Sequence, residues 1–204
     1  LYPSLEFLAW QTQWLAYERD LQRRIGELDE YAVPVFDGAA AMRGKNGTGA
    51  VQVQLRDVTA YNQLYLDAAL GCEGDRDEQC PPWDHVTSLY VCCNNNNLCG
   101  TEVGRWITPF RRSEGRWLTD VSALLPVFAG GRRSGVSTCI LEMRSDAWWA
   151  KAWLPRLTLR FGSKATRRRP FRLEPLFRGG TFDRGYNAKY AAHRFTPPAD
   201  ATKQ

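Results

Sequence analysis

Two adjacent cysteines, Cys92 and Cys93, limit the folds that this chain can adopt. They close an apolar run that begins at Val86 and has the pattern of a β-strand. Neighbouring side chains of a strand point to opposite faces of a sheet, so the two sulfurs need different partners. Cys99 follows after an Asn-rich turn, and Cys139 lies on a later strand candidate. We therefore expect one of the adjacent cysteines to bond Cys99 and the other Cys139, and the sequence leaves open which bonds which.

The other two cysteines, Cys72 and Cys80, enclose a short acidic loop that a disulfide can close. Six cysteines and only two histidines, His85 and His193, show none of the paired spacings of zinc sites. We expect no metal and no cofactor, and disulfides formed in an oxidising compartment. The N-glycosylation acceptor at Asn46 also agrees with the secretory pathway or the cell exterior.

The N-terminal stretch, residues 5–28, has the periodicity of a helix. Apolar side chains recur at alternating spacings of three and four, with Arg24 at the one missing position: Phe7, Trp10, Trp14, Tyr17, Leu21 and Leu28. We expect an amphipathic helix outside the main fold, with this aromatic stripe packed against its own domain or a partner. Attachment to a membrane surface is the alternative. No segment has the roughly 18 uninterrupted apolar residues that span a bilayer.

Beyond this helix, short apolar runs alternate with turn residues, which is typical of an all-β sandwich. Pro34 and the glycines that follow it mark loops. The strand candidates are residues 51–55, 64–66, 86–92, 103–107, 136–143 and 157–161. Residues 120–128 have helical spacing instead and predict a short turn over a sheet edge.

The formal charge of +5 is unevenly distributed, with acidic residues at 73–78 and an arginine run at 167–172. The basic residues match no nucleic-acid-binding motif, so we expect no nucleic-acid partner.

Two aspartates lie beside tryptophans, which suits a site for sugars because indole rings stack on the apolar faces of sugar rings. Asp84 follows Trp83, and Asp146 precedes Trp148. Asp84 is expected to be shielded from water by Trp83 and the preceding proline, which would make it a better base. The structural interpretation is that Asp84 caps a turn.

The order of several motifs resembles the N-terminal domain of the peptide-N-glycosidase F family over residues 33–162. These motifs are Cys80-Pro81-Pro82-Trp83-Asp84, Gly104-Arg105-Trp106-Ile107-Thr108-Pro109-Phe110, Trp117-Leu118-Thr119-Asp120 and Asp146-Ala147-Trp148. The resemblance implies an eight-stranded antiparallel jelly-roll sandwich at residues 33–164, preceded by the helical segment at 1–32. It also implies that residues 165–204 are a linker and the start of a truncated second jelly roll.

The same resemblance implies an amidase that hydrolyses the bond between N-acetylglucosamine and asparagine in N-glycoproteins. Asp84 and Asp146 would be the catalytic carboxylates. The residues expected to bind substrate are Trp83, His85, Arg105 and Trp148. His85 replaces an arginine, and Asp146 replaces a glutamate, of the family pattern.

Because the family completes its site with a second domain, we expect the chain by itself to be inactive. The alternative is a non-catalytic jelly roll that binds glycans or proteins. A copper site of the related monooxygenase architecture is disfavoured, since the sequence has only two histidines, His85 and His193, and no His-x-His.

Overall fold

A computed structural model of the chain describes residues 3–28, 30–44, 47–74, 76–110, 112–130, 135–145, 151–170, 172–174 and 196–197. The chain divides into two compact units, Leu1–Phe171 and Arg172–Gln204. Every helix and strand of the described residues belongs to the first unit.

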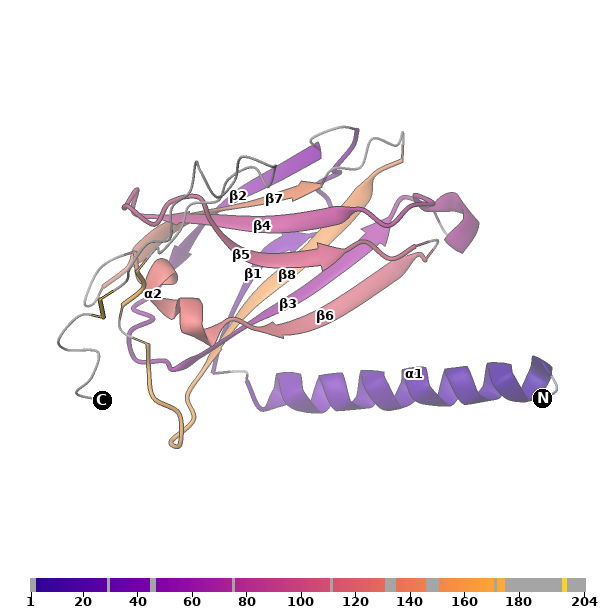
Figure 1. Ribbon diagram of the computed structural model, residues 1–204, viewed down its shortest axis with the longest axis horizontal. Helices are drawn as coiled ribbons and strands as arrows, with labels where there is room; N and C mark the ends of the chain where they lie inside the picture. The colour runs from indigo at the N-terminus through magenta and orange to yellow at the C-terminus, as the bar shows by residue number, and fades with distance from the viewer. Residues whose placement is uncertain are drawn as a thin grey trace. The chain divides into compact units, whose positions relative to one another are not determined.

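The first unit is a sandwich of two four-stranded antiparallel sheets (Figure 1). Its strands are β1 (Tyr31–Asp37), β2 (Gly47–Leu55), β3 (Gln63–Cys72), β4 (Val86–Cys93), β5 (Thr101–Ile107), β6 (Glu114–Asp120), β7 (Ser137–Ser145) and β8 (Trp153–Gly162). One sheet has the order β1-β8-β3-β6 and the other β2-β7-β4-β5. This is the strand order of a jelly roll, and it confirms the predicted fold class.

Alternating side chains of the two sheets fill the space between them. Strand β8 buries every second residue from Trp153 to Phe161, and β7 does the same from Ser137 to Ser145. At one end, the short helix α2 (Leu125–Phe128) follows the 3-10 turn η2 (Ser122–Leu124) and is buried along its whole length. Phe128 of α2 meets Phe161 edge to face, with ring centroids 6.5 Å apart. The helical turn expected at residues 120–128 is confirmed, and it closes this end of the core.

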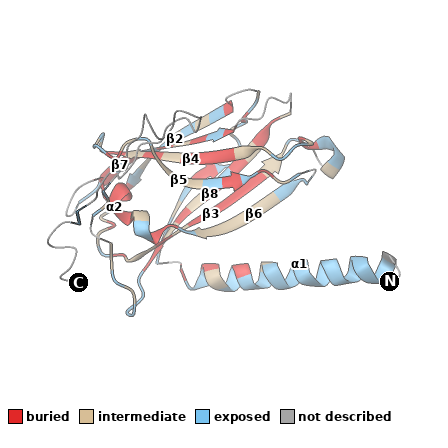
Figure 2. Ribbon diagram, in the orientation of Figure 1, coloured by how far each residue is buried: buried red, intermediate tan, exposed pale blue. Residues whose placement is uncertain are grey.

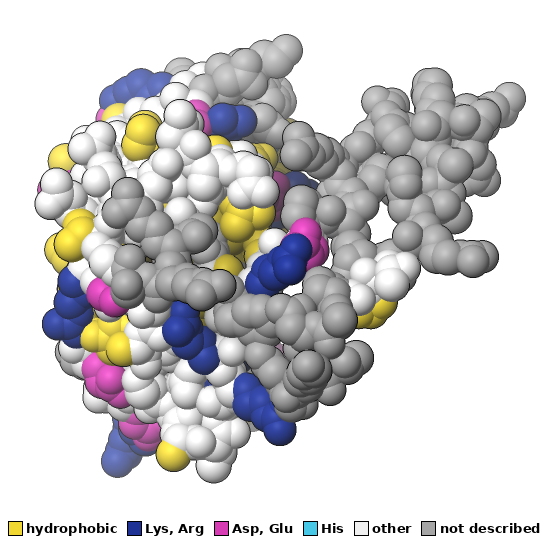
Figure 3. All heavy atoms as spheres, turned by 90° about the vertical axis from the view of Figure 1, so that its left-hand side faces the viewer, with side chains coloured by type: hydrophobic (Ala, Val, Ile, Leu, Met, Phe, Trp, Pro, Cys, Tyr) yellow, Lys and Arg dark blue, Asp and Glu magenta, His cyan; other side chains and the backbone are white. Residues whose placement is uncertain are grey.

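Viewed from the α2 end, basic and acidic side chains are spread among uncharged ones, and several basic side chains lie next to acidic ones (Figure 3).

Two edge strands escaped the sequence patterns, and their positions explain why. Pro34 lies inside β1 and not in a loop. Because β1 is an edge strand with a register shift between Pro34 and Phe36, the missing N–H of the proline costs no ladder bond in the sheet interior. Strand β6 is the opposite edge, and both its faces are only half-buried, so it lacks a clear alternation.

The outer face of the β1-β8-β3-β6 sheet carries a buried ionic cluster. The carboxylate of Asp67 on β3 accepts hydrogen bonds from Arg116 on β6, at 3.1 and 3.2 Å, and from Arg160 on β8, at 3.0 Å. Asp67 is only 7% exposed. The hydrogen bonds to Asp67 raise the pKa of Arg116. The cluster ties three neighbouring strands together across the sheet.

Helix α1 (Pro3–Gly26) confirms the predicted N-terminal helix. Its last turns pack on the sandwich through buried Leu21 and Ile25, and the Tyr17 hydroxyl donates to the carbonyl of Arg116 at 2.9 Å. The aromatic stripe does not pack as expected, because Trp10 and Trp14 are both exposed. In Figure 2 the helix is exposed along most of its length, and its buried residues lie near its C-terminal end. Among the described helices, none is long and apolar enough to cross a membrane.

Three disulfides link the six cysteines and leave no free thiol. Cys92 bonds Cys99, and Cys93 bonds Cys139, its cross-strand neighbour on β7. Cys93 and Cys139 face the core, whereas Cys92 is half-buried on the other face of β4. The expected division of the adjacent cysteines between two partners is confirmed, and so is the Cys72–Cys80 bond.

Candidate functional site

The segment formed by Trp83, Asp84 and His85 leads into β4 at the end of the sandwich opposite α2. Thr108, just after β5, holds the backbone of this segment in place through hydrogen bonds. Its Oγ1 accepts the backbone N–H of His85 at 2.8 Å and donates to the carbonyl of Trp83 at 3.2 Å. Its own backbone N–H donates to the carbonyl of His85 at 2.8 Å. Asp84 therefore lies between two residues that are both hydrogen-bonded to one buried threonine.

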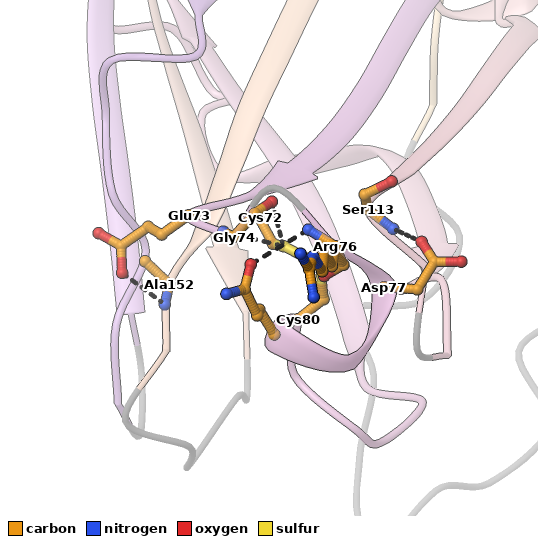
Figure 4. The surroundings of a disulfide bond; sticks show 9 residues. Cys72, Glu73, Gly74, Arg76, Asp77, Cys80, Ser113 and Ala152 are labelled. Atoms are coloured by element: carbon orange, nitrogen blue, oxygen red, sulfur yellow. Dashed lines mark hydrogen bonds between the residues drawn. A yellow bond between two sulfur atoms is a disulfide. The ribbon is translucent and has the colours of Figure 1, made fainter.

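The loop that precedes this segment is held in place by a disulfide and by its own carboxylates (Figure 4). The 3-10 turn η1 (Asp77–Gln79) lies between Cys72 and Cys80. Asp77 accepts the backbone N–H of Ser113 at 2.7 Å and a guanidinium N–H of Arg112 at 2.9 Å. These hydrogen bonds, the one from Ser113 first, lower the pKa of Asp77.

The beginning of the same loop is held by contacts of Glu73 with residues outside the loop. Glu73 forms an ion pair with Arg43 and accepts the backbone N–H of Ala152, immediately before β8, at 3.4 Å. The loop that leads into the site segment is therefore held at both ends, and two of its carboxylates, Glu73 and Asp77, pair with arginines.

The side chains of Asp84 and Trp83 both face solvent, and Trp83 is 51% exposed. The expectation that Asp84 is shielded from water was wrong, since its proline and tryptophan neighbours do not cover it. An exposed carboxylate beside an exposed indole can accept hydrogen bonds from a ligand and offer it a flat apolar surface.

Arg105 lies farther along the sheet than Trp83 and His85. It pairs with Ser88 in the β4–β5 register, whereas Ile107 pairs with Val86 next to the site segment. Its guanidinium forms a bidentate pair with Glu102 at 2.6 and 2.7 Å. The hydrogen bonds from Arg105 lower the pKa of Glu102. The structure therefore brings Trp83, Asp84 and His85 together and places Arg105 on β5 in an ion pair.

Three predicted residues, Asp146, Trp148 and Asn46, lie outside the described residues. The last described residue before Asp146 is Ser145, which pairs with Thr87 of β4. Among the described residues, no three His, Cys, Asp or Glu side chains form a group that could hold a metal ion.

Sequence reasoning missed Thr108 as the residue that supports the site. The only signal was its position within the Gly104–Phe110 motif, because a threonine that bonds backbone atoms 23 residues away leaves no periodicity in the sequence.

Together, the strand order, the three disulfides and the segment braced at one end define a disulfide-bonded jelly-roll domain. The family model described as "Peptide-N-glycosidase F, N terminal" matches residues 28–99 and 94–161, which together cover more than half of the chain. The chain belongs to the family of peptide-N-glycosidase F N-terminal domains.

Solved structures that match part of the chain include a peptide-N(4)-(N-acetyl-β-D-glucosaminyl) asparagine amidase, with 20% identity, 68% of this chain and 44% of that chain covered, and a TM-score of 0.47. A structure of infectious bursal disease virus strain Gx has 11% identity, covers 69% of this chain and 34% of its own, and has a TM-score of 0.35. A putative secreted protein from Parabacteroides distasonis has 9% identity, coverages of 60% and 40%, and a TM-score of 0.30. The chain spans less than half the length of each. Comparison with curated protein sequences found no match.

Proposed function

We infer that this chain is the first domain of an N-glycan amidase, which hydrolyses the amide between N-acetylglucosamine and asparagine in N-glycoproteins. Family membership supports the reaction class. The observation that carries the assignment of the site is the position of Asp84, an exposed carboxylate in a segment that Thr108 and the Cys72–Cys80 disulfide brace on both sides. A general base must be reachable by substrate and held in place, and an exposed Asp84 on a backbone fixed by Thr108 agrees with both requirements.

In this proposal Asp84 accepts a proton from a water molecule as the water attacks the amide carbon. The developing negative charge on the amide oxygen needs hydrogen-bond donors, and the leaving nitrogen needs a proton. Asp146 supports the water as a second carboxylate. The products are aspartate and a glycosylamine, so a C–O bond forms as the C–N bond breaks.

Binding of the first sugar is assigned to the aromatic residues Trp83 and Trp148, with polar contacts from His85 and Arg105. Trp83 exposes half of its surface, as stacking on a sugar ring requires. Arg105 would have to exchange its ion pair with Glu102 for a contact with substrate.

The remaining donors are assigned to a second domain that residues 165–204 begin. The helical segment is assigned to residues 1–32 and the jelly roll to 33–164. Because stabilisation of the transition state needs groups on both sides of the amide, the chain by itself is expected to have little activity. The three disulfides support folding in the secretory pathway or outside the cell.

The test compares release of glycan from a denatured glycopeptide by the parent protein and by its Asp84→Asn variant. Loss of a positioned base typically lowers the rate about 10²–10⁴-fold. The Glu78→Gln variant is a suitable control, since it removes an exposed carboxylate from the same loop without touching the proposed base or the contacts of Asp77. Full activity of the Asp84→Asn variant would refute the catalytic role.

The exposure of both Trp83 and Asp84 favours a second function, a jelly roll that binds glycans without hydrolysing them. The same experiment separates the two functions. A parent protein that binds glycopeptide, releases no glycan and loses affinity on Trp83→Ala would be a binding module.

A further inference from the structure

The first four turns of α1 expose an apolar face rich in aromatic side chains. Its aromatic members are Trp10, which is 69% exposed, Phe7 at 62% and Trp14 at 53%. Leu8 and Leu15 flank them and are also exposed. Between Glu6 and Glu18 this part of the helix has no charged residue. Large exposed apolar patches without charges mark interaction sites.

This face continues a surface that is already used for packing within the chain. Phe7, Trp10, Trp14, Tyr17 and Leu21 follow the alternating three- and four-residue spacing of a coiled-coil seam. Strand β6 covers the seam from Tyr17 onward, where Tyr17, Leu21 and Arg24 face Trp117 and Leu118. The seam therefore has a partner at its C-terminal half and none among the described residues at its N-terminal half.

We propose that the N-terminal half of α1 pairs with the same segment of a second copy of this chain, as an antiparallel two-helix coiled coil. A seam of this kind requires a helical partner with matching apolar residues, and a second copy supplies them. The alternation predicts central layers in which Trp10 of each copy meets Trp14 of the other. The positions beside the two-fold axis are Gln11 and Gln13, which are uncharged and create no repulsion.

The position of the sandwich along α1 determines whether the two helices of the dimer are parallel or antiparallel. In a parallel pair both sandwiches would compete for the space beside the C-terminal half of α1, where β6 already lies. An antiparallel pair puts the two sandwiches at opposite ends. The exposed side chains can bury on the order of 500 Å² per copy, about 1,000 Å² in total. That area matches the small end of specific interfaces, so the dissociation constant is expected to be micromolar.

The experiment is sedimentation equilibrium of the whole 204-residue chain from about 1 to about 300 µM, a range that brackets such affinities. The wild-type protein should form dimers as the concentration rises. Trp10→Glu should weaken dimerisation by roughly 30-fold or more, the loss typical of a central interface tryptophan. The matched control is Ala16→Glu, which adds the same charge to the same helix at an exposed position off the seam. Near-ultraviolet circular dichroism verifies that the sandwich of each variant is intact.

Orientation is tested by Gln11→Cys, whose thiol is new in a chain without free cysteines. An antiparallel pair brings the two introduced thiols to the axis, and they should form a disulfide under mild oxidation. A parallel pair keeps them on opposite sides of the coiled coil. Three outcomes would overturn the proposal: a monomer at all concentrations, a dimer that Trp10→Glu leaves unchanged, or a monomer that binds uncharged lipid vesicles through α1. The last outcome would assign the face to a membrane surface.

Discussion

The buried hydroxyl of Thr108 accepts the backbone N–H of His85 at 2.8 Å and thereby connects the end of edge strand β5 to the segment that carries Asp84. A second bond from the same hydroxyl reaches the carbonyl of Trp83. One side chain thus holds the backbone on both sides of Asp84 in place, although it is itself buried and only 2% exposed.

Replacing this hydroxyl tests its structural role directly. Thr108→Val keeps the size of the side chain and leaves the His85 N–H without its partner, so the free energy of unfolding should fall by about 1–3 kcal/mol. Thr108→Ser retains the hydroxyl and should recover most of the loss. Denaturant titration of the three proteins measures both effects, and equal stability of the valine and serine variants would contradict the role of the hydroxyl.

The ionic cluster on the outer face of the β1-β8-β3-β6 sheet gives the next prediction. Asp67→Asn leaves Arg116 and Arg160 side by side without their shared anion, and removing one partner of a buried ion pair costs about 3–5 kcal/mol. Glu114→Gln is the control, since the ion pair of Glu114 with Arg156 is exposed on both sides and should contribute less than about 1 kcal/mol. Thermal or chemical unfolding that ranks Glu114→Gln as the more harmful change would refute this account.

The third prediction concerns the absence of a side chain at Gly104, which lies on the inner face of β5. A Cβ atom there would lie 2.5 Å from Cη2 of Trp106 and 3.0 Å from Cδ1 of Leu66. Trp106 is held by its own hydrogen bond to Thr119 at 3.2 Å, so it cannot move away without loss.

Gly104→Ala should therefore destabilise the protein by about 1–3 kcal/mol through overpacking. The matched control is Gly26→Ala at the end of α1, where a Cβ meets no atom within 4 Å. This control should be neutral or slightly stabilising, because alanine favours helix over glycine. Similar midpoints of denaturation for the two variants would show that the space around Gly104 relaxes.

Acid should destabilise the protein through carboxylates whose pKa values are lowered in the folded state. Burial opposes ionisation of Asp120, but hydrogen bonds from Arg167 and Ser122 outweigh it and lower its pKa. The pKa of Asp77 is lowered mainly by the N–H of Ser113. A lowered folded-state pKa contributes stability above the unfolded-state pKa of about 4, and this contribution is lost as the pH falls through the folded-state value.

Urea titrations from neutral pH to about pH 2 should show a falling free energy of unfolding below about pH 4. The loss over this interval should be smaller for Asp120→Asn than for the wild type. Glu78→Gln, which changes an exposed carboxylate on η1, should follow the wild-type curve. An Asp120→Asn curve parallel to that of the wild type would exclude Asp120 as a contributor.

The sequence predicted those strands and helices whose residues alternate regularly between the core and the solvent. Leu141 and Met143 alternate with partly exposed residues on β7 because that strand lies between core and solvent. Pro34 led to the wrong prediction of a loop, because a proline is compatible with an edge strand. Whether a strand lies at an edge depends on the strand order of the sheet. The burial of Asp67 depends on two arginines from strands that are distant in sequence, so no local pattern marks it.

The candidate site divides in the same way. The sequence itself shows that Trp83 and Asp84 are adjacent. Their exposure and their support by Thr108 depend on the pairing of β5 with β4, which no local pattern shows. The aromatic stripe of α1 predicted the helix correctly. Periodicity shows that a helix has an apolar face, but it does not show whether residues of the same chain pack against that face.

The adjacent cysteines require that strand β4 forms before Cys92 and Cys93 are oxidised. Exchange of partners between Cys92 and Cys93 would join the same two regions of chain with the wrong sulfur, and only the alternation of a formed β4 strand distinguishes them. Oxidation that precedes strand formation is therefore free to trap the wrong pairing, which thiol–disulfide exchange must then reverse. The yield of correctly folded protein from any expression host should depend on disulfide isomerase capacity more than on oxidising strength alone.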